Sequence, residues 1–401
     1  MKYIVLVGDG MFDYPLQELN GKTPLEAAKT PYMDFIAKEG LCGMVNTIPM
    51  HMTAGSDVAN LSILGYDPVK YYTGRGPLEA ANLGVVLSDN DYAFRCNLIT
   101  ENEGILIDYS AGHIGNKEAK ALIKFIDHKL SNENIKFYPG VSYRHLMKIT
   151  VTDKKFTPHC EAPHDILGKE IERHLPKGPG SQVLVDLMLE SRKLLTGHEI
   201  NEVRIDLKEN PANMIWLWGQ GKTPKLKNFY EKFGISGAII SAVDLIKGIG
   251  KIIGLEVIEV PGATGYYDTN FRGKAEYALN SLELKDFVFV HVEAPDEAGH
   301  SGDIRAKITA IENFDSQVVG VMLEKLKEKG EEFRILVLPD HATPISIRTH
   351  TNEPVGFAIY GSGIQKDSVD EFNEKSLKNS SLKIRKGNRL LELLLRGEEK
   401  K

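Results

Sequence analysis

Residues 287–300 read FVFVHVEAPDEAGH, a short and mostly apolar run that ends in acidic side chains and a histidine. β-Branched and aromatic residues in so short a run are typical of a strand that is buried on both faces. Similar runs occur elsewhere in the chain, at 3–7, 183–187, 214–218, 237–241, 335–338 and 355–360. Helical patterns lie between many of them, at 24–39, 243–253 and 307–329. This alternation predicts an α/β fold with a mainly parallel sheet sandwiched by helices.

Polar residues follow three of these predicted strands. Asp9 follows the run at 3–7, and Asp340 begins the polar residues after 335–338. The motif PDEAGH, with Asp296 and His300, follows the run at 287–292. Functional side chains in parallel α/β sheets gather at the carboxyl ends of the strands. We therefore expect these residues to converge on one site.

The stretch from 88 to 180 has a different pattern. It contains short alternating segments, such as DYAFRCNLIT at 91–100, and loops rich in proline, glycine and histidine. At 401 residues the chain is long enough for two domains. We predict an inserted, smaller α+β domain over 88–180, within a core domain formed by 1–87 and 181–401.

Charge and cysteine content exclude several classes of protein. A net charge of −6 gives no basic surface for nucleic acid or for an acidic membrane. The apolar run at 3–7 is too short for a signal peptide or a membrane span. The three cysteines are far apart, which argues against disulfides and thiolate zinc sites and suits a reducing compartment. We expect a cytoplasmic protein that acts on a small molecule.

Six residues near the predicted strand ends have side chains that bind divalent metal ions such as Mn²⁺ or Zn²⁺: Asp9, Asp296, His300, Asp340, His341 and His350. Each has an ordinary alternative when taken alone. Asp9 could cap a turn between a strand and a helix, and His350 could be a surface residue. As a set, with Ser56, they would suffice for two ions, which stabilise both oxygens in a phosphoryl transfer.

Ser56 stands in the segment TAGSDVAN at 53–60, where small residues precede a predicted helix. Backbone N–H groups at a helix start would face a phosphate on this hydroxyl. A metal ion can lower the pKa of the serine and make it a nucleophile without a histidine base. The alternative is that Ser56 is a plain N-cap. The chain has neither a GxSxG motif nor a GxxxxGK[ST] loop. The sequence therefore does not support a serine hydrolase or a nucleotide-binding protein with a Walker loop.

Several longer stretches resemble one protein family. They are GKTPLEAAKTPYMD, GSDVANLSILGYDP, YYTGRGPLEAANLG, DYSAGHIG, FYPGVSYRHL, PGATGYYDTNF, HVEAPDEAGHSGD and LPDHATP. With Gly8-Asp9-Gly10 after the first strand, they resemble the archaeal-type branch of cofactor-independent phosphoglycerate mutases, in the alkaline phosphatase superfamily. The resemblance runs from residue 1 to about 360. It implies an alkaline-phosphatase-like core.

The resemblance also implies a mechanism. One metal ion would be held by Asp9, Ser56, Asp340 and His341, and the other by Asp296, His300 and His350. Ser56 would take the phosphate of 3-phosphoglycerate and return it to the 2-hydroxyl, as in glycolysis and gluconeogenesis, without a bisphosphoglycerate primer. Mn²⁺ is the expected ion, and Zn²⁺, Co²⁺ and Mg²⁺ are alternatives.

Basic residues are candidates for binding the anionic substrate. Arginine binds carboxylate and phosphate in bidentate fashion, and we expect Arg95 and Arg144 of the inserted domain to do so. Polar neighbours that could assist are Asn97, Asp108 and His113. We expect Lys274 to stabilise charge at the phosphoryl group, with Arg272 as its alternative. Arg75 could support a turn or bind phosphate.

Other functions stay open from the sequence. A phosphatase shares the first half-reaction, and similar bacterial chains have been proposed to be homoserine kinases. Gly55 stands where the longer bacterial mutases have asparagine, and the predicted insertion is shorter than theirs, so their substrate contacts transfer less directly. A non-catalytic metal-binding protein would not need Ser56. The oligomeric state stays open.

Overall fold

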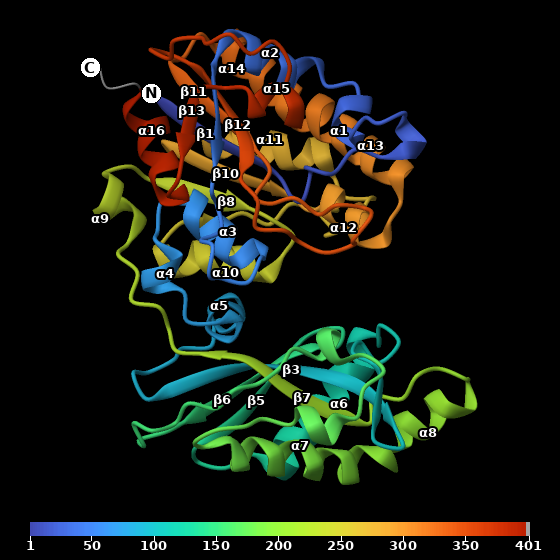
Figure 1. The fold of residues 1–401 in the computed structure, drawn as a ribbon. Coiled ribbons are helices and arrows are strands. Elements are labelled where there is room, and N and C mark those ends of the chain that lie inside the picture. The colour runs from blue at the N-terminus through green and yellow to red at the C-terminus, as the bar shows by residue number, and fades with distance from the viewer. Residues whose placement is uncertain (398–401) are drawn as a thin grey trace. The chain divides into compact units, whose positions relative to one another are not determined.

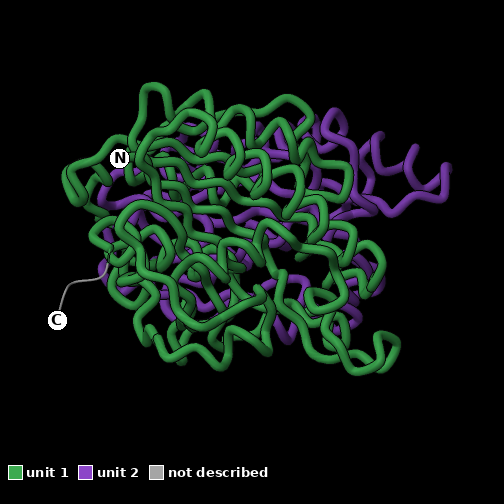
Figure 2. The backbone as a smooth tube through the Cα atoms, turned by 90° about the horizontal axis from the view of Figure 1, so that it is seen from above, with its two compact units in different colours: residues 1–72, 225–401 green, residues 73–224 purple. Residues whose placement is uncertain are grey.

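The computed structural model describes residues 1–397, which form two compact units. The first unit comprises Met1–Tyr72 and residues from Lys225 onward, and the second comprises Thr73–Pro224. Figure 2 colours the two units separately. The chain therefore leaves the first unit once and returns to it once.

An eight-stranded sheet forms the centre of the first unit (Figure 1). Its strands are β1 (Lys2–Gly8), β2 (Leu41–Val45), β8 (Gly237–Ile240), β9 (Glu256–Val257), β10 (Phe287–Val292), β11 (Phe333–Leu338), β12 (Val355–Gly361) and β13 (Leu382–Ile384). Their order across the sheet is β13-β2-β12-β11-β1-β10-β8-β9, and β12 alone runs antiparallel to its neighbours. The expected mainly parallel sheet is confirmed.

Helices cover both faces of this sheet. They are α1 (Pro24–Ala27), α2 (Pro31–Glu39), α3 (Ser56–Ile63), α4 (Pro68–Tyr71), α9 (Phe229–Phe233), α10 (Asp244–Ile253), α11 (Phe271–Ser281), α12 (Ala294–Ser301), α13 (Ile304–Asn313), α14 (Val321–Lys329), α15 (Glu374–Lys378) and α16 (Leu390–Arg396). Short helical turns are η1 (Gln17–Leu19) and η5 (Gly387–Arg389), and a π-helical turn, η4 (Phe314–Gly320), joins α13 to α14. Helices α2, α11 and α14 pack around η4, whereas α3 and α16 pack around η5 (Figure 1).

The central position of β1 explains its sequence. β1 pairs in parallel with β10 on one side and β11 on the other, with Val7 opposite His291 and Leu338. Ile4, Val5, Leu6 and Val7 are fully buried, as expected for a strand covered on both faces. The carboxyl ends of these three strands therefore lie at the same edge of the sheet.

The second unit is built on an antiparallel sheet. Its elements are α5 (Arg75–Asn82), β3 (Asp91–Asn102), β4 (Ile105–Asp108), α6 (Asn116–Leu130), β5 (Ile135–Val141), β6 (Arg144–Thr150), η2 (Pro163–Ile166), η3 (Ile171–His174), α7 (Ser181–Thr196), α8 (Glu199–Asp206) and β7 (Met214–Gly221). The long strand β3 pairs with β4, β6 and β7. Helices α6 and α7 contribute to one buried apolar cluster with this sheet.

Three expectations about these elements need correction. Residues 183–187, predicted as a strand, lie in helix α7, where Leu184, Leu187 and Met188 fall on one buried face. Residues 214–218 do form a strand, but β7 belongs to the second sheet. The predicted helix over 24–39 is broken between α1 and α2, because Pro31 disfavours helical geometry at Thr30.

The second unit is also longer than the expected range of 88–180. Its first helix, α5, packs on β3 and β7. Its last strand, β7, completes the sheet by pairing with β3 from Ala93 to Ile99. Because of these contacts, the second unit extends from Thr73 to Pro224.

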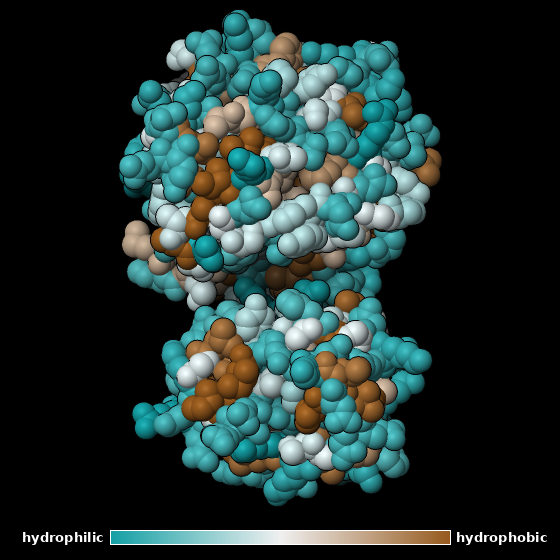
Figure 3. Space-filling model, turned by 90° about the vertical axis from the view of Figure 1, so that its right-hand side faces the viewer, coloured by the Kyte–Doolittle hydropathy of each residue, from teal (hydrophilic) through white to brown (hydrophobic). Residues whose placement is uncertain are grey.

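The visible surface of each unit is mainly hydrophilic, with separate hydrophobic patches (Figure 3). Among the described residues, no helix has the length and apolar character required to span a membrane.

Candidate active site

The polar residues after β1, β10 and β11 meet at the carboxyl edge of the first sheet. The backbone N–H of Asp9 donates to the carbonyl of Val292, 3.0 Å away, which joins the ends of β1 and β10. The N–H of Gly10 donates to Asp340 Oδ1 at 3.2 Å, which joins β1 to the residues after β11. Gly10 has a φ of 59°, and a Cβ there would lie 2.5 Å from Asp296 Oδ1. Only glycine lets the chain pass this close to Asp296.

Asp296, His300 and His350 form the first cluster of donor atoms. Asp296 and His300 lie four residues apart on α12, so both side chains point to the same side of the helix. His300 Nε2 is 3.2 Å from Asp296 Oδ2, and His350 Nε2 is 3.5 Å from Asp296 Oδ1. The two Nε2 atoms are 2.9 Å apart, and the hydroxyl of Thr343 donates to Asp296 Oδ1.

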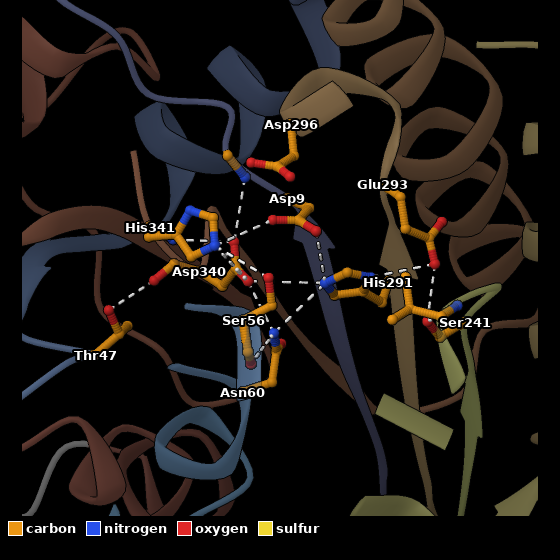
Figure 4. A network of polar contacts seen from close by, with 12 residues as sticks. Asp9, Thr47, Ser56, Asn60, Ser241, His291, Glu293, Asp296, Asp340 and His341 are labelled. Carbon is orange, nitrogen blue, oxygen red and sulfur yellow. Dashed lines mark hydrogen bonds and ion pairs between the residues drawn. The ribbon is translucent and has the colours of Figure 1, made fainter. Parts of the chain in front are cut away.

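Asp9, Ser56, Asp340 and His341 form the second cluster, which Figure 4 shows from close by. His341 Nε2 lies 3.5 Å from Asp9 Oδ1, 3.6 Å from Asp340 Oδ2 and 3.1 Å from Ser56 Oγ. Asp9, Asp340 and His341 are almost fully buried, and Ser56 is half-buried. Three residues of this cluster are therefore buried, and Ser56 is the one that is partly exposed to solvent.

Ser56 is the first residue of α3, with Gly55 at the N-cap position. Because Gly55 and not Ser56 occupies the N-cap position, the alternative of a plain N-cap does not describe Ser56. The hydroxyl points instead toward His341, as Figure 4 shows. Asn60, one turn along α3, donates to Asp340 Oδ2 at 2.8 Å and to the carbonyl of Ser56 at 2.8 Å. Asn60 thus holds the start of α3 against the second cluster.

The buried carboxylates shape the electrostatics of this edge. Burial raises the pKa of Asp9 well above its ordinary value, and the negative charges of Asp340 and Asp296 raise it further. Burial also lowers the pKa of His341 to about 4, so its ring is neutral at neutral pH. Several acidic groups in so small a buried volume require nearby positive charge.

The donor atoms fit divalent metal ions. Within each of three groups the donor atoms lie within 4.8 Å of one another: Asp296, His300 and His350; Asp9, Asp296 and His341; Asp9, His291 and Asp340. Asp9 Oδ1 is buried and accepts no hydrogen bond, although a buried carboxylate oxygen normally has a partner. Carboxylate oxygen and imidazole nitrogen suit Mn²⁺, Zn²⁺ and similar ions.

Two residues of this site escaped the sequence analysis. His291 is fully buried within β10, and its Nε2 lies 3.4 Å from Asp9 Oδ2. Glu293, just beyond the strand, lies on the other side of the same ring, 3.4 Å from Nδ1. Side chains two residues apart in extended backbone point to the same side, so His291 and Glu293 could have been predicted to lie together. This spacing is the sequence signal for the two residues.

Lys274, the residue expected to stabilise charge at the phosphoryl group, lies on α11. Its ammonium group is fully buried, donates to the carbonyl of His291 at 2.9 Å and pairs with Glu293. These two partners use two of the three N–H groups of the ammonium, so its role at a phosphoryl group stays a prediction. The alternative, Arg272, has a side chain that is 65% exposed and pairs with Glu276 on the same helix, α11. Neither residue lies among the two donor clusters.

The second unit brings its predicted arginines together. Burial lowers the pKa of Arg95, Glu79 opposes this shift, and the charges of Arg75 and Arg144 lower the pKa further. The guanidinium groups of Arg75 and Arg95 lie 5.6 and 5.0 Å from the ring centre of Trp218. The Nε atoms of Arg95 and Arg144 are buried and have no hydrogen-bond partner. Such orphaned donors are unusual and mark a group suited to an anion.

The polar neighbours of these arginines have other contacts. Trp218 Nε1 donates to Asn97 Oδ1 at 3.0 Å, so Asn97 supports the tryptophan. Asp108 accepts hydrogen bonds from the loop that follows it, including those from Ser110 N at 2.7 Å and Gly112 N at 2.8 Å. His113 is exposed, with its ring centre 5.9 Å from that of Tyr143. Asp108 therefore orders a loop.

Comparison with known proteins gives consistent results. The family described as 2,3-bisphosphoglycerate-independent phosphoglycerate mutase matches residues 37–201. A protein of that name from Methanosarcina mazei is 51% identical over 397 residues, which cover 99% of this chain and 100% of the relative. The solved structure of PH0037 from Pyrococcus horikoshii has a TM-score of 0.82 at 30% identity and covers 100% of this chain and 98% of its own. A cofactor-independent phosphoglycerate mutase from Thermoplasma acidophilum has a TM-score of 0.66 at 29% identity, over 99% of each chain.

Proposed function

The chain belongs to the family of 2,3-bisphosphoglycerate-independent phosphoglycerate mutases, and we propose that it interconverts 3-phosphoglycerate and 2-phosphoglycerate through phosphoserine at Ser56. The observation that carries this proposal is the position of Ser56. Its hydroxyl lies 3.1 Å from His341 Nε2, beside two clusters of side chains that could bind metal, and Gly55 rather than Ser56 is the N-cap of α3.

We assign one ion to Asp9, Ser56, Asp340 and His341, and a second ion to Asp296, His300 and His350. Divalent ions held there would lower the pKa of the serine hydroxyl and stabilise charge on the attacking and leaving oxygens. Mn²⁺ is the ion that we propose, because carboxylate and imidazole ligands together suit it.

In the proposed reaction, Ser56 holds the phosphoryl group after it leaves the 3-oxygen of glycerate and before it reaches the 2-oxygen. Its Oγ forms a bond to phosphorus as the bond from phosphorus to the 3-oxygen breaks, and the serine proton ends on that oxygen. The 2-oxygen of glycerate then attacks phosphorus, the Oγ–phosphorus bond breaks, and the 2-hydroxyl proton returns to Ser56. Because no phosphate enters or leaves overall, no primer is needed.

The start of α3 stabilises the phosphorylated serine. The first backbone N–H groups of a helix have no partner within it, and the helix dipole places partial positive charge there. A phosphate on the first residue of α3 would face these groups. Asn60 holds this helix start through its hydrogen bond to the Ser56 carbonyl.

The arginines of the second unit are the proposed ligands of the substrate carboxylate. Arg95 and Arg144 carry buried Nε atoms without partners, and a bidentate carboxylate contact would use such donors. Arg75, stacked on the same tryptophan as Arg95, belongs to this group. Holding the glycerate while Ser56 carries the phosphate distinguishes a mutase from a phosphatase.

A coupled assay tests the function. Purified protein is incubated with 3-phosphoglycerate, enolase and Mn²⁺, without 2,3-bisphosphoglycerate, and with chelator in a parallel reaction. We expect 2-phosphoglycerate to form only in the reaction that contains Mn²⁺. Release of inorganic phosphate without 2-phosphoglycerate would show a phosphatase and contradict the proposal.

A further inference from the structure

The ring of His291, near the end of β10, lies between two aspartates on one side and Glu293 on the other (Figure 4). On one side its Nε2 lies 3.4 Å from Asp9 Oδ2 and 3.8 Å from Asp340 Oδ2. On the other side its Nδ1 lies 3.4 Å from Glu293 Oε1. The ring is completely buried, so protein atoms surround it on both sides.

Glu293 has several hydrogen-bond partners in addition to its contact with His291. Its Oε1 accepts hydrogen bonds from Ser241 Oγ at 2.8 Å and from the N–H of Ala242 at 2.7 Å. Its Oε2 accepts one from Lys274, whose ammonium is also anchored on the His291 carbonyl at 2.9 Å. Glu293 is therefore fixed by two residues that follow β8 and by Lys274 of α11.

A buried ion pair adds little to stability, because two charges lose their water on folding. Lys274 and Glu293, with side chains only 0% and 3% exposed, incur that cost. The Lys274–Glu293 pair is better explained by the neighbouring side chain that it holds in position. Here the pair fixes the position of His291, and His291 lies against two of the carboxylates that we assign to one metal ion.

We propose that His291 is a positioning residue for the metal ion at Asp9 and Asp340, and that Glu293 and Lys274 hold it in place. Residues behind metal ligands set the orientation of those ligands, and their loss typically weakens metal binding about 10- to 100-fold. His291 fills this place for two carboxylates at once. The inference rests on the proposed function, because it takes these carboxylates to be metal ligands.

The test measures Mn²⁺ binding to metal-free protein by titration calorimetry, with a mutase assay on the same samples. The variant His291→Phe keeps the ring and removes both nitrogens. The matched control is His145→Phe, because His145 is a similarly buried histidine in the second unit, where its Nδ1 accepts from Gly140 N. Circular dichroism establishes that each variant is folded.

We expect wild-type protein and His145→Phe to bind two ions with the same affinities. His291→Phe should bind one ion as before and the other about tenfold to a hundredfold more weakly. His291→Gln should recover part of this loss, because its side-chain amide reaches the position of the imidazole Nε2. Two unchanged affinities in a folded His291→Phe protein would overturn the inference while leaving the mutase function intact.

The double variant Lys274→Met/Glu293→Gln tests the support of His291 without leaving a buried charge unpaired. We expect the same site to weaken in this variant and the second site to keep its affinity. Unchanged binding at both sites would show that the ion pair has no positioning role. Wild-type protein that neither binds Mn²⁺ nor forms 2-phosphoglycerate would instead contradict the proposed function itself.

Discussion

Ser56 is distinguished from other serines by what its hydroxyl contacts. It opens α3 without capping it and lies against His341. Ser62, on the same helix, has its Cβ near the backbone of Gly387 and is buried in the packing with η5. The two serines share a helix but not a chemical environment, so they form a matched pair for mutagenesis.

Replacing Ser56 with alanine should abolish mutase activity, with a fall in turnover of at least about a thousandfold, because the proposed reaction passes the phosphate through its hydroxyl. The half-buried side chain contributes little packing, so the melting temperature should change by only a few degrees. Ser62→Ala should retain activity. Substantial mutase activity in folded Ser56→Ala protein would show that phosphate does not pass through this residue.

At the scale of elements, the helix α2 begins at a buried acidic group. Asp315, in the π-helical turn η4, accepts hydrogen bonds from the N–H groups of Met33 at 2.7 Å and Tyr32 at 3.3 Å. Burial raises the pKa of Asp315 to about 7, although these two hydrogen bonds act in the opposite direction. The carboxyl group is therefore more easily protonated in the folded chain than in the unfolded chain.

This shift predicts how stability depends on pH. The folded pKa of Asp315 lies above its unfolded value of about 4, so its contribution to stability is complete below pH 4 and is lost as the pH rises through 7. The free energy of unfolding of wild type minus that of Asp315→Asn should fall by about 4 kcal/mol over this range, because each of the three pKa units contributes about 1.4 kcal/mol. Urea denaturation at several pH values measures it. A difference independent of pH would contradict the assignment.

Element patterns explain why some of the site could be predicted and some could not. The ends of β1, β10 and β11 were visible as polar residues after apolar runs, and parallel pairing brings such ends together. Part of helix α7 was mistaken for a strand, because a short run of four apolar residues and one aspartate at 183–187 fits either structure until its partners are known.

Lys274 shows the limit of local reasoning. Its sequence neighbourhood suggested a cation near phosphate, which stays a prediction, but gave no sign that the packing of α11 on β10 pairs the ammonium with Glu293. His291 was hidden for the same reason. A histidine inside an apolar strand acquires a role only through residues that follow other strands, here Asp9 and Asp340.

At the scale of the whole molecule, the first unit concentrates negative charge at one edge of its sheet. Asp9, Asp296 and Asp340 lie almost fully buried in neighbouring positions. Their mutual repulsion opposes folding unless cations bind. The stability of the whole protein should therefore depend on divalent metal ions.

Adding Mn²⁺ to metal-free protein should raise the melting temperature by several degrees, because an ion at a hundredfold excess over its Kd adds about 2.7 kcal/mol. Differential scanning calorimetry measures the shift. Asp340→Asn should lose much of it, whereas Asp91→Asn, a buried aspartate in the second unit, should retain it. Equal shifts in the two variants would contradict the assigned metal ligands.

The most direct test of the account is to find the phosphate on Ser56 during turnover. Protein turning over 3-phosphoglycerate with Mn²⁺ is quenched in acid within milliseconds, digested and examined by mass spectrometry. We expect phosphoserine at Ser56 in a fraction of the molecules, and none in protein quenched without substrate. Steady formation of 2-phosphoglycerate with phosphate on a histidine, or on no residue at all, would contradict it.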